Sequence, residues 1–217
     1  MTRLLLIGLL VIAPAAVTGG SRPTARETAQ AIQQKYDRVK DFTADFTHTY
    51  EGGVLKKKLT ERGTVQIKKL GRMRWEYLAP EKKTFVSDGR KVYSYIPADK
   101  QVIVSSMPAD DEATTAVLFL AGKGDLARDF TVSYADGAPD GTLALRLDPK
   151  QKQRDYDWLV LGVDGKTLQI RSLTAAEKPG GRSMFQFGNY RENTGLPDSV
   201  FAFKIPRGAD VITAGSR

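Results

Sequence analysis

The sequence contains no cysteine and only one histidine, His48. Without cysteine the chain forms no disulfide, holds no thiolate metal site, has no cysteine nucleophile and offers no cysteine for lipid attachment. A single histidine cannot build a histidine-rich metal site, and no acidic cluster has ligand spacing. Neither a nucleophile elbow nor a phosphate-binding glycine loop is present. We therefore expect no enzyme, no metal and no cofactor, and a hydrogen-bonded structural role for His48.

Long hydrophobic runs are also scarce. The run from Leu4 to Ile12 follows Arg3 and has the length of a signal-peptide core, and Ala13-Pro14-Ala15 provides small residues for cleavage. No later run approaches the roughly 18 apolar residues of a membrane span. We predict a signal peptide over residues 1–20, cleaved after Ala15 or shortly beyond, and a single exported domain over residues 21–217.

Charge of one sign is in excess. The formal net charge is +8, but basic residues are spread along the chain rather than gathered in one stripe. Such a spread indicates solvated strand faces, and we expect no nucleic-acid partner. A basic group at residues 56–58 with Lys82 and Lys83 either steers docking to an acidic partner or serves solubility alone. At 217 residues and 41% hydrophobic composition, the chain suits one domain with a sizeable core.

A helix is predicted over residues 24–40. Thr24 and Glu27 have capping-box spacing. Apolar residues then recur at intervals of three and four, which places them on one face of a helix. One apolar face means that the helix packs on the rest of the domain.

From residue 41 the hydrophobic period changes to two, which is typical of strands with one apolar face. Glycine-containing turns such as Asp88-Gly89 and Asp164-Gly165 separate the runs. We count about eleven short strands. The last is expected to carry Phe201, Phe203 and Ile205 on one face, and the residues from Gly208 onward are expected to be loose. This pattern predicts a mainly β fold with α-helices, built as a strongly curved antiparallel sheet or open barrel.

A helical insert interrupts the strands. Acidic residues 110–112 precede an apolar run over residues 113–121, which fits a helix N-terminus followed by a short helix. The run is apolar nearly all round, so it must either be covered or cover another part of the molecule. A second short helix is expected around residues 125–129.

The stretch from residue 63 to residue 88 carries the most informative side chains. Met73, Trp75 and Tyr77 alternate with charged residues, so they share one face of a single short strand. These large side chains either fill a core or line a cavity, and composition alone favours the filled core.

Three segments, taken in order, carry a resemblance to a known family. They read DFTADFTHTYEG (residues 41–52), GTVQIKKLGRMRWEY (63–77) and VSDGRKVYSYIP (86–97). Together with the helical insert, the signal peptide and the absence of cysteine, they make the chain similar to the periplasmic outer-membrane lipoprotein carrier family, LolA. The resemblance implies a periplasmic monomer with an unclosed β-barrel of about eleven strands, an N-terminal helix and a helical lid. It implies a chaperone that receives lipoproteins from an inner-membrane ABC transporter, shields their acyl chains in an apolar cavity and passes them to an outer-membrane acceptor.

The same resemblance assigns site residues. On this template the lipid-binding cavity is lined by Met73, Trp75, Tyr77, Phe85 and Tyr93, and the lid positions are Val117, Leu118 and Leu120. Lys69 stands where many family members have an arginine that latches the lid. Lysine keeps the charge but lacks the planar fork of arginine, so the latch is expected to be looser or different.

Two other readings stay open at this point. One is an envelope interaction module on the same fold that senses a lipoprotein or a lipid. The other is an enzyme acting on lipids, which the single histidine disfavours.

Overall fold

The computed structural model describes residues 22–52, 57–107, 124–178 and 180–213. The predicted signal peptide, the acidic residues 110–112 and the proposed lid residues Val117, Leu118 and Leu120 lie outside these ranges.

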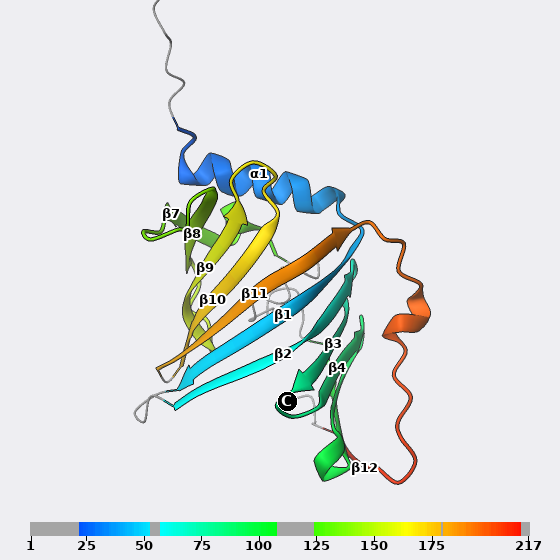
Figure 1. Ribbon diagram of the computed structural model, residues 1–217. Helices are drawn as coiled ribbons and strands as arrows, with labels where there is room; N and C mark the ends of the chain where they lie inside the picture. The colour runs from blue at the N-terminus through cyan, green and yellow to red at the C-terminus, as the bar shows by residue number, and fades with distance from the viewer. Residues whose placement is uncertain (1–21, 53–56, 108–123, 179, 214–217) are drawn as a thin grey trace, which may run out of the picture.

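One sheet of twelve strands forms the body of the molecule (Figure 1). The strand order is β12-β6-β5-β4-β3-β2-β1-β11-β10-β9-β8-β7, so the edge strands β12 and β7 do not pair and the sheet is unclosed. All neighbours are antiparallel except β12 and β6, which are parallel. The predicted fold class is confirmed, with twelve strands against the expected eleven or so.

The elements are α1 (Ala25–Arg38), β1 (Asp41–Gly52), β2 (Lys57–Lys68), β3 (Arg72–Ala79), β4 (Lys83–Asp88), β5 (Lys91–Ile96), η1 (Pro97–Asp99), β6 (Gln101–Ser106), α3 (Leu126–Asp129), β7 (Phe130–Tyr134), β8 (Thr142–Pro149), β9 (Tyr156–Asp164), β10 (Ile170–Glu177), β11 (Gly181–Glu192), η2 (Asp198–Phe201) and β12 (Asp210–Thr213).

Helix α1 begins with the predicted capping box. The backbone N–H of Glu27 donates to Thr24 Oγ1 over 3.2 Å, and the backbone N–H of Thr24 donates to Glu27 Oε2 over 2.8 Å. Each bond satisfies a donor that the start of a helix would leave unpaired. Ala29 and Ile32 are fully buried in the same hydrophobic core as the inner face of the sheet. The helix lies across the strand ends at one side of the sheet (Figure 1).

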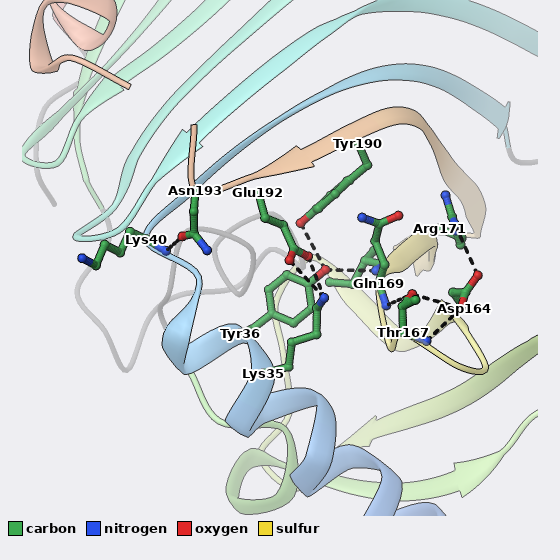
Figure 2. Close-up of polar contacts among 11 residues, drawn as sticks. Lys35, Tyr36, Lys40, Asp164, Thr167, Gln169, Arg171, Tyr190, Glu192 and Asn193 are labelled. Atoms are coloured by element: carbon green, nitrogen blue, oxygen red, sulfur yellow. Dashed lines mark hydrogen bonds and ion pairs between the residues drawn. The ribbon is translucent and has the colours of Figure 1, made fainter. Parts of the chain in front are cut away.

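Tyrosine hydroxyls fix α1 to the sheet near both of its ends. At the C-terminal end Tyr36 points toward β10 and β11, where its hydroxyl lies 3.1 Å from the Tyr190 hydroxyl and accepts from the Ile170 N–H over 3.0 Å (Figure 2). Near the N-terminal end the Tyr134 hydroxyl lies 2.7 Å from Thr28 Oγ1 and donates to the Pro23 carbonyl over 2.8 Å. We infer that α1 is a fixed part of the domain rather than a moving one.

The C-terminal segment, residues 193–209, runs as a strap from the end of β11 alongside β3 and β4 to β12 (Figure 1). Its start is held by the buried carboxylate of Asp41, which accepts from the backbone N–H of Thr194 over 2.7 Å and of Gly195 over 3.1 Å. Further along, Asp198 makes ion pairs with Lys68 and Arg72.

The predicted last strand through Phe201, Phe203 and Ile205 is wrong. Phe201 ends the short helix η2 and is 1% exposed, and Phe203 stacks on Tyr93 with ring centroids 5.3 Å apart. Of the residues expected to be loose, Asp210–Thr213 instead form β12 beside β6, and residues 214–217 lie outside the described ranges. The reason is that Tyr93 and Tyr95 present aromatic surface on the outer face of β5, and Phe203 covers it instead of joining a ladder.

Candidate functional site

The inner face of the sheet is the face that packs in one hydrophobic core with α1. It carries a group of large apolar side chains from β1, β3, β4 and β11. We call this group the aromatic wall; its members are Phe46, Met73, Trp75, Tyr77, Phe85, Phe185 and Phe187. Strand register brings them together, because Trp75 lies opposite Phe85 on β4 and Phe46 lies opposite Phe187 on β11. The structure thus gathers four of the predicted cavity residues, Met73, Trp75, Tyr77 and Phe85.

Phe46 and Trp75 form the centre of the aromatic wall. Their ring centroids are 5.1 Å apart, and Phe46 also lies 4.9 Å from the Tyr77 ring. Phe185 approaches Trp75 to 5.4 Å. These contacts are edge-to-face, the geometry that aromatic quadrupoles favour. Met73 is 8% exposed, Trp75 4% and Tyr77 9%, so any ligand of the wall must first gain access to it.

A glycine on β2 makes room for this packing. A Cβ on Gly63 would lie 2.0 Å from the Glu76 carbonyl oxygen and 2.7 Å from the Phe46 ring. Only glycine fits a backbone approach this close. The position coincides with a register shift between β2 and β3.

Tyr93 is not part of the wall. Phe85 lies opposite Ser94, and Tyr93 lies opposite Val86, so Tyr93 points to the outer face of the sheet. There it packs against Phe203 of the strap. We therefore leave Tyr93 out of the site.

A buried polar cluster lies beyond Tyr77, at the end of the wall remote from α1. It consists of Glu61, His48, Lys83 and Ser183. The carboxylate of Glu61 makes an ion pair with Lys83 Nζ and lies within hydrogen-bond distance of His48 Nδ1, at 3.1 Å, and its side chain is 6% exposed. His48 Nε2 lies 2.6 Å from Ser183 Oγ, and the His48 ring stacks on Phe185 with centroids 4.2 Å apart. The hydrogen-bonded role expected for His48 is therefore seen.

The polar cluster affects the neighbouring wall. Burial raises the pKa of Tyr77, and the negative charge of Glu61 raises it further, so the phenol is neutral at physiological pH. Ser183, His48 and Glu61 are joined in the order of a catalytic triad, but Ser183, the third residue of β11, is only 4% exposed. A nucleophile must reach its substrate, so the arrangement favours a structural role.

The sequence alone did not predict that these four side chains form a cluster. His48 shares the parity of Phe46 along β1, and that parity was the only local signal for it. Its pairing with Glu61 follows from the β1–β2 register, and its contact with Ser183 depends on β11 lying beside β1.

At the opposite end of the wall, Lys69 binds α1. Its ammonium donates to the Asp37 carbonyl in the last turn of α1, and its backbone N–H donates to the Lys40 carbonyl over 3.0 Å. A cation at a helix C-terminus also stabilises the helix dipole. Gly124 and Lys69 line the same small cavity, of about 30 Å³. The latch proposed for Lys69 stays a prediction, since the lid lies outside the described residues.

The described residues that flank the proposed lid are anchored near the wall. Before it, the Met107 backbone N–H donates to the Arg90 carbonyl over 2.8 Å. After it, the Leu126 backbone N–H donates to Gln33 Oε1 of α1 over 3.2 Å.

Within the described ranges, no group of three or more histidine or acidic side chains is placed to hold a metal ion. No helix in those ranges is long and apolar enough to cross a membrane.

Comparison with known protein families shows which family the chain belongs to. Residues 37–204 match the family model of the outer membrane lipoprotein carrier protein LolA, which is most of the chain. The chain belongs to the LolA family. A carrier protein of Cupriavidus pinatubonensis is 30% identical over 202 residues, covering 91% of this chain and 93% of the relative. One of Chromohalobacter salexigens is 31% identical over 189 residues, covering 86% and 87%. Both bear the name outer-membrane lipoprotein carrier protein.

The fold is also found in solved structures. An uncharacterized conserved protein from Thermus thermophilus superimposes with a TM-score of 0.55 at 11% identity, covering 87% of this chain and 98% of that one. This likeness concerns the fold alone.

Proposed function

We propose that this LolA family member is a periplasmic carrier that holds the acyl chains of lipoproteins against the aromatic wall. The observation that supports it most is the wall itself, a continuous set of aromatic and methionine side chains on the inner face of an unclosed sheet. Met73 adds a flexible thioether that adapts to chains of different shape. The residues give no sign of bond-breaking chemistry, so the carrier is proposed to move its cargo unchanged.

The energetics of acyl chains limit how they are held. Burial of each CH₂ gains about 0.8 kcal/mol, so complete burial of two or three long chains would exceed ~20 kcal/mol and prevent release. The proposed carrier therefore buries the chains only in part. Because Trp75 and its neighbours are covered in this structure, loading requires the wall to be uncovered, and the covering shields apolar surface from water when no cargo is present.

Partial burial of the acyl chains implies one partner that loads the carrier and another that unloads it. An inner-membrane ABC transporter would supply the energy for loading, and an outer-membrane acceptor with more apolar surface would receive the cargo. Lys57, Lys58 and Lys82 are exposed and offer a basic surface for docking to an acidic partner.

Coexpression with an outer-membrane-type lipoprotein tests the proposal. Mass spectrometry of the purified carrier should show the acylated lipoprotein bound. Phe185→Asp, on the wall, should abolish this, whereas Leu78→Asp, on the outer face of β3 where Leu78 is 57% exposed, should not. Recovery of unacylated lipoprotein alone, or of equal acylated cargo with both variants, would overturn the proposed function.

A further inference from the structure

The indole N–H of Trp75 is a buried donor without an acceptor. Trp75 is 4% exposed, and its Nε1 has no hydrogen-bond partner among the residues that the structure describes. Most buried polar groups in native proteins are paired, and an unpaired one is costly, so each exception calls for an explanation.

The aromatic rings beside Trp75 in the described part of the chain carry no oxygen. Its ring neighbours are Phe46 at 5.1 Å, Phe185 at 5.4 Å and Phe187 at 6.4 Å. The face of an aromatic ring is at most a weak acceptor for an N–H. The cross-strand partners Val65 and Phe85 carry apolar side chains, and the backbone groups of a central strand are used in the ladder.

The position of this donor is informative. It lies at the centre of the aromatic wall, between the polar cluster at one end and the contact of Lys69 with α1 at the other. An N–H placed in an apolar site discriminates strongly between ligands that carry an acceptor and ligands that do not, because the wrong ligand leaves it unpaired. Every acyl chain begins at a carbonyl, which is an acceptor with no hydrogen to donate.

We propose that Trp75 Nε1 donates a hydrogen bond to an ester or amide carbonyl oxygen of the cargo's lipid anchor. Trp75 is then a specificity-determining residue that fixes where the acyl chains start, while the phenylalanine rings contact the hydrocarbon. This inference rests on the proposed function and goes beyond it. A wall that made only apolar contacts would bind alkyl ether chains as tightly as acyl ester chains.

Two synthetic ligands separate these possibilities. One is a short peptide whose N-terminal cysteine carries a dipalmitoylglyceryl group, and the other is the same peptide with two hexadecyl ether chains in place of the esters. The protein variant replaces Trp75 by benzothienylalanine, which has nearly the shape of tryptophan and carries sulfur where the N–H was. The same replacement of Trp158, the other tryptophan, is the matched control.

The wild-type protein should bind the ester ligand about ten-fold more tightly than the ether ligand, and the Trp75 replacement should remove that preference. The Trp158 replacement should keep it. The indole N–H signal of Trp75 in an ¹⁵N spectrum should move when the ester binds and stay when the ether binds. In the ligand-free state the Trp75 replacement should melt no lower than the wild type, because the donor that it removes is unpaired.

Equal binding of both ligands to wild type and to the Trp75 replacement would overturn this inference and leave the carrier function intact. Lower melting of the ligand-free Trp75 replacement would also overturn it, since the N–H would then already have a partner. Failure of either ligand to bind the wild type would overturn the proposed function as well.

Discussion

Removal of the lysine charge alone from the polar cluster at the end of the aromatic wall should cost more stability than removal of the lysine and glutamate charges together. Glu61 is 6% exposed at its side chain and Lys83 is 22% exposed, so each group depends on the other for compensation. Lys83→Met leaves the buried Glu61 carboxylate without its lysine cation, in contact with His48 Nδ1, and should lower the free energy of unfolding by about 3 kcal/mol. Glu61→Gln should cost about 2 kcal/mol, less because the lysine partly reaches water.

The double variant should cost no more than Glu61→Gln alone, about 2 kcal/mol, since no charge is left uncompensated. The coupling energy of the cycle is then about 3 kcal/mol, measured by urea unfolding at pH 7. Lys178 and Asp157, an ion pair whose aspartate is 62% exposed, provide the matched control. The same cycle on that pair should give less than about 1 kcal/mol. Equal coupling in the two cycles would refute the view that the wall ends in a desolvated charge cluster.

Three further predictions concern the packing of the wall and of α1. Gly63→Ala places a methyl group against the Glu76 carbonyl and should lower the free energy of unfolding by about 3 kcal/mol in urea titrations; a cost under about 1 kcal/mol would contradict the tight approach. Burial raises the pKa of Tyr36 from 10.0 to about 12, so the unfolded chain loses this proton first. That stabilisation is complete below pH 10 and is lost as pH rises toward 12, by about 2–3 kcal/mol, and Tyr36→Phe should weaken this alkaline slope in unfolding titrations. Lys69→Met removes the bond to Asp37 and should cost about 1 kcal/mol in the same titrations without speeding cargo release. Faster release would show that Lys69 also latches the lid.

Features that depend on neighbours in the chain could be predicted from the sequence. The capping box of α1 needs only Thr24 and Glu27, and it forms as predicted. The alternation of Met73, Trp75 and Tyr77 fixes their common face whatever the rest of the sheet does. The short helix α3 and the turn at Asp88-Gly89 are local in the same sense.

Features that depend on distant pairing could not be predicted. Tyr93 alternates as cleanly as Trp75, but which face it takes is set by the register of β4 with β5. A shift of one residue reverses every side chain of a strand, and the sequence of the turn does not fix that register alone. The strap shows the same limit, because Phe201 and Phe203 alternate like a strand, yet Phe201 ends η2 and Phe203 covers the outer face of β5.

The most direct test of the central claim is photocrosslinking from the two faces of the sheet. Phe85 and Tyr93 lie on adjacent strands but point to opposite faces, so each is replaced in turn by benzoylphenylalanine. In cells that express an acylated lipoprotein, irradiation should link position 85 to the acyl chains and position 93 to none. Crosslinking to acyl chains from position 93 alone, or equally from both positions, would contradict the assignment of the cargo to the aromatic wall.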